Sequence, residues 1–320
     1  MNILFITSTR IGDAVLSSGL LHHLLQAYPT AQFTIAAGPI AAELFMGMPR
    51  LERLHIVTKQ PYGWHWPILW SKVVAIKWDM VIDLRNSLLS YLVLTSARYI
   101  LKPRHSNDHR VIQLGNLFQL NPPPAPHLWT NSIEDEQAKN LIPSGLTVLA
   151  IAPTANWNGK QWPAPQFIKL LERLTQPDSL FPSAKVAVFG AKNEYQQASP
   201  ILDSIPIERR LNFVGNSSLS LVYALLKRCT FFIGNDSGVM HLAAAAGIPT
   251  LGLFGPSRIE LYHPWGKYTA AVRTPESFED FISAPGYDYR TQRSLMGSLT
   301  VEKVEQQVYE LWQKAYGAVA

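Results

Sequence analysis

Short apolar runs alternate with amphipathic stretches along most of the chain. Residues 2–7 form an apolar run that is typical of a buried strand, and a polar turn follows it. Residues 13–27 carry leucines at helical spacing, which predicts a helix with one buried face. Further strands are expected at residues 32–36, 54–57 and 80–83, and a helix near residues 40–46. This alternation predicts a parallel sheet covered by helices.

A proline-rich segment at residues 121–126 separates this region from a second one with the same pattern. A helix is expected at residues 133–140, and the second strand series comprises residues 147–152, 185–189, 212–214, 231–233 and 250–254. We therefore predict an α/β chain with two domains, residues 1–143 and 144–298. Residues 299–320 contain a final amphipathic helix that could pack on either domain, including back on the first.

Composition and charge narrow the class of protein. The 320 residues are 47% apolar, which is enough for two cores, and the single cysteine excludes an internal disulfide. No run of about 18 apolar residues could span a bilayer, and the opening residues lack the features of a signal peptide, so we expect a cytoplasmic protein. The net charge of +5 is scattered, which favours phosphorylated small molecules or anionic membranes over nucleic acid.

The most informative stretch is residues 231–256, where a buried strand ends in a Gly-Asn-Asp-Ser-Gly turn before an alanine-rich helix. Ser237 and Gly238 fall where a helix start leaves backbone N–H groups unpaired, which suits the diphosphate of a nucleotide. Asp236 could accept hydrogen bonds from sugar hydroxyls, and His241 follows on the same helix. The alternative is that Asp236 is an ordinary helix cap and the small residues only permit close packing.

This segment resembles glycosyltransferase family 9, the family of the ADP-heptose:lipopolysaccharide heptosyltransferases. The residues that carry the resemblance are Asp236, Ser237, Gly238, His241, Pro249 and residues 254–256, together with residues 10–13, 160–163 and, more weakly, 81–84. The resemblance implies a GT-B fold, in which two Rossmann-like domains face each other across a cleft. The N-terminal domain would bind the acceptor and the C-terminal domain the nucleotide sugar.

The resemblance also implies roles for single residues. Asp13 matches the family's catalytic aspartate and would remove the proton of the acceptor hydroxyl, although its position also suits a helix cap. Lys160 would stabilise the charge of the departing diphosphate, the alternative being a solvated surface lysine. The family often has Thr-Thr before this lysine, whereas this chain has Ala-Asn-Trp-Asn at residues 155–158. Phosphate contacts would therefore come from Thr154 or Asn156.

Acceptor binding is expected in the first domain. Arg10 and Gly12 belong to the turn after the first strand, and Arg85 and Arg104 follow the strand at residues 80–83. The planar guanidinium group of arginine suits the carboxylate or phosphate groups of a lipopolysaccharide core. Dispersed arginines are more often solvated surface residues, so each is only a candidate.

The function expected is an inverting glycosyltransferase that moves heptose, or a related sugar, from a nucleotide diphosphate to a lipopolysaccharide-core or other glycolipid acceptor. We expect no cofactor, because the nucleotide sugar is itself a substrate, and no metal, because the histidines lack ligand spacing. One alternative is a sugar-nucleotide epimerase with the same fold. The other is a non-catalytic nucleotide-sugar-binding relative.

Residues 62–78 contain four tryptophans together with Lys72 and Lys77. This composition suits a segment that dips into lipid headgroups, with Trp64, Trp66 and Trp70 as the contact residues. The alternative is a core helix preceded by a loop that packs on it. The first interpretation predicts peripheral contact with the inner face of the cytoplasmic membrane.

Overall fold

The computed structural model of the chain describes residues 1–102, 106–215, 217–288 and 293–317. It divides into unit 1, Met1–Asn131, and unit 2, Ser132–Ala320. None of the helices among the described residues is long and apolar enough to cross a bilayer.

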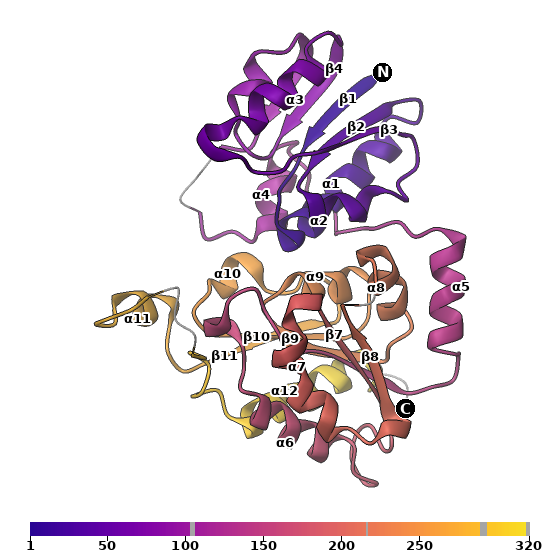
Figure 1. Cartoon of the computed structure of the whole chain (residues 1–320), viewed down its shortest axis with the longest axis vertical. Helices are drawn as coiled ribbons and strands as arrows, with labels where there is room; N and C mark the ends of the chain where they lie inside the picture. The colour runs from indigo at the N-terminus through magenta and orange to yellow at the C-terminus, as the bar shows by residue number, and fades with distance from the viewer. Residues whose placement is uncertain (103–105, 216, 289–292, 318–320) are drawn as a thin grey trace. The chain divides into compact units, whose positions relative to one another are not determined.

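Unit 1 is built on one parallel sheet (Figure 1). Its strands are β1 (Asn2–Ile6), β2 (Gln32–Ala37), β3 (Leu51–Ile56), β4 (Trp78–Asp83) and β5 (Thr95–Ile100). Their order is β3-β2-β1-β4-β5, and every pairing is parallel. The chain therefore reverses its direction of travel across the sheet between β1 and β4, which is where doubly wound sheets bind ligands.

The four strands expected in this region are confirmed, and the pattern misses only β5. This edge strand has exposed residues alternating with half-buried ones, because a neighbour pairs with only one of its sides. Serine and arginine on such a strand hide the apolar signal that β1 shows, where residues 3–6 are all buried.

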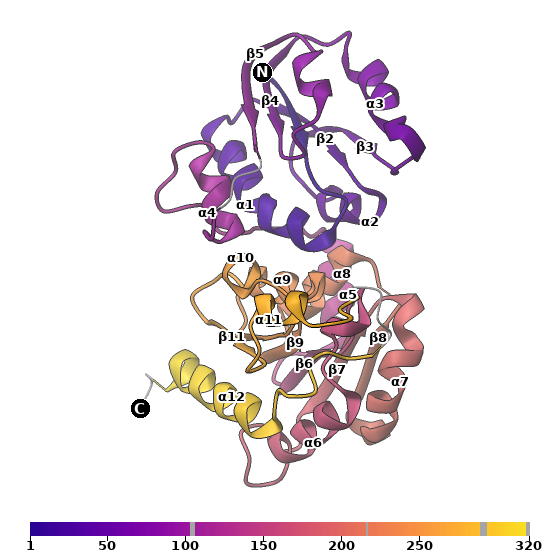
Figure 2. The same cartoon turned by 90° about the vertical axis from the view of Figure 1, so that its left-hand side faces the viewer.

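The helices of unit 1 cover both faces of the sheet (Figures 1 and 2). They are α1 (Ile11–Ala27), α2 (Pro39–Ala42), α3 (His65–Val73) and α4 (Arg110–Asn116), with short 3-10 turns η1 (Glu43–Phe45), η2 (Pro61–Gly63) and η3 (Leu88–Tyr91). The proline-rich segment lies directly on α1: a Cβ at Gly19 would come within 2.4 Å of the carbonyl oxygen of Ala125. Glycine is therefore required at position 19 for this close approach.

Unit 2 repeats the architecture with six parallel strands. They are β6 (Val148–Ala152), β7 (Lys185–Gly190), β8 (Arg210–Val214), β9 (Phe231–Asn235), β10 (Thr250–Phe254) and β11 (Thr269–Arg273). Their order is β11-β10-β9-β6-β7-β8, so the corresponding reversal falls between β6 and β9. The five expected strands are confirmed, and the edge strand β11 is again the one that the pattern misses.

The remaining elements of unit 2 flank this sheet (Figure 2). The helices are α5 (Ser132–Leu141), α6 (Ala164–Leu174), α7 (Tyr195–Ser204), α8 (Leu219–Leu226), α9 (Gly238–Ala245), α10 (Ile259–Tyr262), α11 (Phe278–Ser283) and α12 (Val301–Tyr316). The 3-10 turns are η4 (Asn158–Lys160), η5 (Lys192–Glu194) and η6 (Ile207–Arg209). The apolar face of α12 joins the core of unit 2, where Val304 and Val308 are buried with Phe167 of α6. The last helix therefore packs on the second unit and not on the first.

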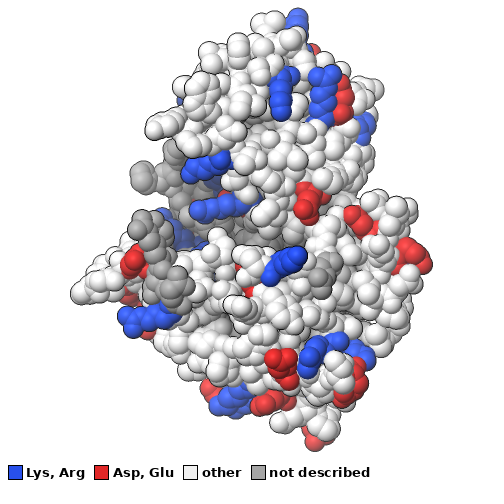
Figure 3. All heavy atoms as spheres, in the orientation of Figure 1, with Lys and Arg blue, Asp and Glu red and all other residues white. Residues whose placement is uncertain are grey.

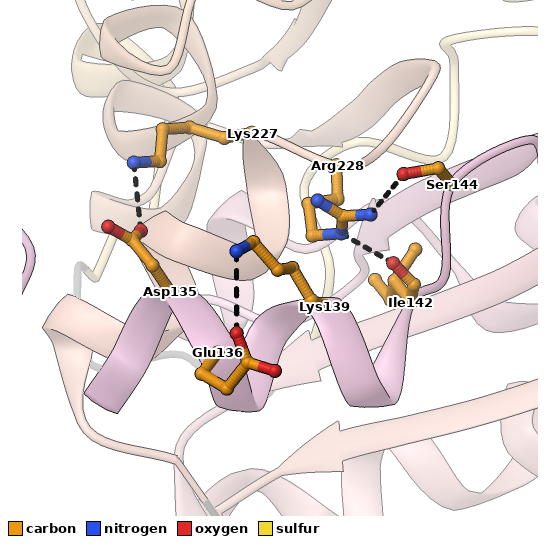
Figure 4. A network of polar contacts seen from close by, with 7 residues as sticks. All are labelled: Asp135, Glu136, Lys139, Ile142, Ser144, Lys227 and Arg228. Atoms are coloured by element: carbon orange, nitrogen blue, oxygen red, sulfur yellow. Dashed lines mark hydrogen bonds and ion pairs between the residues drawn. The ribbon is translucent and has the colours of Figure 1, made fainter. Parts of the chain in front are cut away.

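Helix α5 belongs to unit 2, so the chain divides at residues 131 and 132 rather than after residue 143. Lys227 forms an ion pair with Asp135 at 3.1 Å, and Arg228 donates hydrogen bonds to the carbonyl oxygen of Ile142 at 2.5 Å and to Ser144 Oγ at 2.9 Å (Figure 4). A proline-rich segment shows where regular structure stops, but it cannot show which side the next helix packs on.

Candidate active site

The candidate donor site of unit 2 lies at the carboxyl ends of β6 and β9, at the point where the strand order reverses. Asn235, the last residue of β9, is completely buried and fixes the loop that follows β6. Its Nδ2 donates to the carbonyl oxygen of Pro153 at 2.7 Å, and its Oδ1 accepts from the backbone N–H of Trp162 at 3.0 Å. These two bonds hold the β6 loop, which carries Lys160, against the end of β9.

Lys160 and Asp236 are brought together from positions 76 residues apart. Lys160 Nζ donates to Asp236 Oδ2 at 2.6 Å, and the two side chains are 23% and 8% exposed. A lysine so enclosed differs from the solvated surface lysine of the alternative interpretation. Its ammonium group is held at the end of β9, where it can meet an anion, and one neighbouring carboxylate offsets its charge.

The start of α9 supplies the dipolar part of the site. Ser237 is the N-cap residue, and its side chain does not cap the helix. Its Oγ is buried without a hydrogen-bond partner among the described residues. Gly238 is the first helical residue, so the N–H groups of the first turn have no partner within the helix. Together these groups form a set of donors suited to an anion. His241 lies one turn along α9 and is only 4% exposed.

Thr154 and Asn156 are placed differently from each other. Thr154 is buried, and its hydroxyl donates to Glu194 Oε2 at 2.6 Å. The same carboxylate oxygen accepts from the backbone N–H of Ala191 at 2.9 Å. Asn156 is exposed in the loop after β6. Thr154 thus connects the end of β6 to the loop after β7, and Asn156 is the more accessible of the two toward a ligand.

In unit 1, a pocket of about 280 Å³ lies at the carboxyl ends of β1, β2 and β3 and reaches the loop after β4, across the point where the strand order reverses. Its lining residues are Ile6, Thr7, Thr9, Arg10, Ala36, Val57, Lys59, His65, Trp66 and Arg85. Arg10 and Arg85, both predicted from the sequence, line it together, and Arg85 Nη1 lies 3.5 Å from Thr9 Oγ1. Gly12 does not line the pocket, and Arg104 lies outside the described residues.

No carboxylate among the described residues pairs with the cations of this pocket. Arg10, Lys59 and Arg85 are exposed, and the part of the chain that the structure describes offers none of them an ion pair. The loop that carries Arg85 is ordered by Asp83, which is completely buried. Asp83 accepts from the backbone N–H groups of Arg85 at 2.8 Å and Ser87 at 2.7 Å. The arrangement leaves three cationic groups ready for an anionic ligand.

Asp13 is half-buried in the first turn of α1. The N-cap residue of this helix is Arg10, so Asp13 does not have the N-cap position that the alternative interpretation gave it. Ser8 Oγ donates to Asp13 Oδ2 at 3.3 Å. Its Oδ1 forms no hydrogen bond or ion pair with the residues that the structure describes, so this oxygen is open to a proton from a ligand.

Comparison with known proteins places the chain in a family. The family model described as glycosyltransferase family 9 (heptosyltransferase) matches residues 121–281, which is about half of the chain. The chain belongs to glycosyltransferase family 9. It is 25% identical over 318 residues to a lipooligosaccharide heptosyltransferase 2 of Haemophilus influenzae, covering 86% of this chain and 89% of that protein.

Solved structures show the same fold. A glycosyl transferase family 9 protein from Veillonella parvula has a TM-score of 0.79 at 19% identity, covering 97% of this chain and 96% of the other. An Escherichia coli ADP-heptose lipopolysaccharide heptosyltransferase II has a TM-score of 0.76 at 20% identity, covering 98% and 99%. The family 9 chain therefore has the predicted GT-B fold and is a glycosyltransferase. The family match does not favour the epimerase or the non-catalytic relative.

The sequence patterns did not predict that Lys59, Glu194 and Asn235 belong to these sites. Each follows or ends a parallel strand, which is the position where doubly wound sheets place their ligand-binding residues. Asn235 stands directly before Asp236 in the most informative motif. Lys59 and Glu194 have no local motif, and only the position of the strand ends could have found them.

The described residues contain no group of three or more histidine, cysteine, aspartate or glutamate side chains that could hold a metal ion. That the reaction needs no metal stays a prediction. The one cysteine, Cys229, is buried, and burial raises the pKa of its thiol to about 12. It is therefore a thiol rather than a nucleophilic thiolate at neutral pH.

Proposed function

We propose that this glycosyltransferase moves heptose, or a related sugar, from a nucleotide diphosphate to a lipopolysaccharide-core acceptor, with inversion at the anomeric carbon. The expected donor is ADP-heptose. The names of the relatives support this choice, since they include lipooligosaccharide heptosyltransferase 2 and ADP-heptose lipopolysaccharide heptosyltransferase II. The observation that carries the proposal is the enclosed Lys160–Asp236 pair beside the start of α9.

The donor diphosphate would be bound by unit 2. Its oxygens would accept from the backbone N–H groups at Gly238 and from Ser237 Oγ, which is buried without a partner in the described part of the chain. Lys160 would follow the phosphate charge as it grows during departure. Asp236 holds the lysine at 2.6 Å and would also accept from hydroxyls of the donor sugar. Thr154, Asn156 and His241 remain proposed donor-binding residues.

The acceptor would be bound by unit 1. The cations of the pocket, Arg10, Lys59 and Arg85, suit the carboxylate or phosphate groups of a lipopolysaccharide core. Asp13, one helical turn beyond Arg10, would then act as the general base. Gly12 and Arg104 remain proposed acceptor-binding residues.

The proposed reaction is a single displacement. The Asp13 carboxylate takes the proton of the acceptor hydroxyl while that oxygen forms a bond to the anomeric carbon of the donor sugar. The bond between this carbon and the diphosphate oxygen breaks, and its electron pair leaves with the diphosphate beside Lys160. We also propose that the enzyme needs no metal and works in the cytoplasm, against the inner face of the cytoplasmic membrane.

A donor panel tests the proposal. ADP-, GDP- and UDP-sugars are compared by thermal shift, because a bound donor stabilises the folded state by RT ln(1 + [L]/Kd). Transfer is then measured with a lipopolysaccharide-core acceptor, and the anomeric configuration of the product is determined. We expect the largest shift with ADP-heptose, and product only when acceptor is present. Donor turnover without acceptor, at the C2 position of the sugar, would instead identify an epimerase.

A further inference from the structure

The tryptophan-rich segment does not form one kind of structure. Trp78 is buried in β4, and Trp66 is partly buried against the same apolar cluster, so the core interpretation is right for these two. Trp64 and Trp70 are exposed at the start and on the outer side of α3. Trp66 also lines the pocket. Trp64 and Trp70 are therefore the tryptophans of this segment that could contact lipid, and Trp66 is not.

A second element presents apolar side chains next to α3. Leu69 and Val73 of α3 share one buried cluster with Leu89 and Val93, so helix α3 and the segment around η3 pack on the same part of the core. Their outer sides are joined by a hydrogen bond from Trp70 Nε1 to the carbonyl oxygen of Leu92 at 3.0 Å. The exposed apolar residues of these two elements and of η2, which we call the α3–η3 surface, are Tyr62, Trp64, Ile68, Trp70, Leu88, Tyr91, Leu92 and Leu94.

The exposure of this surface is large for apolar side chains. Leu88 is 79% exposed and Tyr62 is 100% exposed. Tyr62 also has a φ of 53°, a left-handed conformation that costs free energy for a residue with a side chain. Eight large apolar side chains concentrated on neighbouring elements mark a site of interaction, whereas singly scattered ones do not.

The charges around the α3–η3 surface identify its partner. Residues 53–78 and 84–102 contain no aspartate or glutamate, whereas they contain Arg53, Lys59, Lys72, Lys77, Arg85, Arg98 and Lys102. Lys72 and Lys77 are exposed beside the apolar residues, and the Arg98 guanidinium lies 5.5 Å from the ring centre of Tyr91. Much of unit 1 around α3, which can be located from Figure 1, is white in Figure 3, the colour of residues other than Lys, Arg, Asp and Glu. Tryptophan, tyrosine and leucine with a cationic border are the composition of interfacial membrane-binding segments.

We infer that the α3–η3 surface of unit 1 docks on a lipid bilayer that contains anionic headgroups. Trp64, Leu92 and Leu94 enter the interface, and Lys72 and Lys77 meet the anionic groups. This inference rests on the proposed function, in which a glycolipid acceptor gives the membrane contact its role. His65 and Trp66 of α3 line the cationic pocket, so the same helix contributes to the bilayer contact and to the acceptor site.

Vesicle flotation with the full chain tests this inference. The vesicles contain phosphatidylcholine alone, or phosphatidylcholine with phosphatidylglycerol, and the salt concentration is varied. We expect the wild-type protein to float with the anionic vesicles and less so as salt rises, because salt screens the lysine charges. The triple variant Trp64→Ser, Leu92→Ser, Leu94→Ser should partition at least about tenfold more weakly, since three apolar side chains no longer enter the interface.

The matched control removes exposed apolar residues from unit 2. Ile133, Leu141 and Ile207 are also exposed, so the triple variant Ile133→Ser, Leu141→Ser, Ile207→Ser should float like the wild type. Circular dichroism checks that both variants are folded. If the first one is not, the pair Lys72→Glu, Lys77→Glu replaces it, and its flotation should fall at low salt.

Three results would overturn the inference. These are a wild type that ignores anionic vesicles at low salt, a folded surface variant that floats like the control, and a wild type that dimerises through this surface instead of binding vesicles. Transfer to a water-soluble acceptor fragment is measured on the same proteins. Because this assay needs no bilayer, its failure counts against the proposed function, and failure of flotation counts against the α3–η3 surface.

Discussion

The two candidate sites occupy corresponding places in their units, yet their charged groups are held in different ways. Both lie at the carboxyl ends of parallel strands where the strand order reverses. In unit 2, Lys160 is paired with Asp236 and largely enclosed. In unit 1, Arg10 and Arg85 are exposed and lack a carboxylate partner among the described residues. The charged groups of the unit 2 site are thus held in place without a ligand. Those of the unit 1 site are exposed, and an anionic ligand would neutralise them.

This difference fits the chemistry proposed for each unit. A departing diphosphate is stabilised best by groups that are already in position, because no reorganisation is then needed during the reaction. A large, flexible acceptor with several anionic groups is recognised by exposed cations that adjust to it. Substitutions at Lys160 or Asp236 should therefore affect stability and chemistry together, whereas those at the exposed cations of the unit 1 pocket should affect acceptor use alone.

The largest effect is expected at Asp13. Asp13→Asn should lower the transfer rate at least ~100-fold, because the amide cannot accept the acceptor proton. Donor affinity should be nearly unchanged, since Asp13 is in unit 1 and the donor is proposed to bind unit 2. Transfer kinetics and calorimetric donor titration on one preparation measure both quantities. Transfer at the wild-type rate would remove Asp13 from the reaction.

Lys160 should show the coupling of stability and chemistry in unit 2. Lys160→Met leaves the buried Asp236 carboxylate without its partner, which should cost about 1–3 kcal/mol of unfolding free energy as well as donor affinity. Urea denaturation and donor titration measure the two losses. The double variant Lys160→Met, Asp236→Asn should recover stability but not transfer. If it also recovers transfer, the lysine has a structural role only.

Lys59 is the matched control in unit 1. It is exposed and forms no ion pair within the described residues, so Lys59→Met should change the unfolding free energy by less than about 0.5 kcal/mol. A destabilisation equal to that of Lys160→Met would show that the two sites do not differ in the way described.

A smaller effect is expected at Arg85. Arg85→Gln should raise the KM for acceptor about tenfold, which corresponds to the loss of one charge-assisted hydrogen bond. The donor KM should not change. Initial rates at several salt concentrations check the electrostatic origin, because the wild-type acceptor KM should rise with salt more steeply than that of the variant. A change confined to the donor KM would reassign the unit 1 pocket.

The smallest effect concerns the stability of unit 1 at low pH. His22 of α1 stacks on His127 with ring centroids 3.9 Å apart, and burial, aided by the charge of His23, lowers its pKa from 6.5. The folded state therefore favours the neutral ring. Stability from this residue is present above pH 6.5 and decreases as the pH falls toward the lowered pKa. Denaturation at several pH values should show a weaker decline for His22→Gln, and equal declines would contradict this account.

Local sequence patterns predicted most of the strands and helices, the two parallel sheets covered by helices, and the resemblance to family 9. Apolar runs such as residues 148–152 are buried on both faces of a parallel sheet, so their signal is local and strong. The motif around Asp236 combines a strand end, a tight turn and a helix start within one continuous stretch, so it can be recognised without knowing any distant contact. Residues 10–13 and 160–163 were found for the same reason.

Local patterns do not show which side chains come into contact, because those contacts depend on how the elements pack. The Lys160–Asp236 pair joins two loops 76 residues apart. Its geometry depends on Asn235, which stands directly before Asp236 and binds the loop of Lys160 at Pro153 and Trp162. The edge strands β5 and β11, the assignment of α5 and α12 to unit 2, and the division of the tryptophans between core and surface are likewise settled by packing. The physical reason is the same in each case. Burial depends on which surfaces come together in space, and a sequence pattern records only which residues are able to be buried.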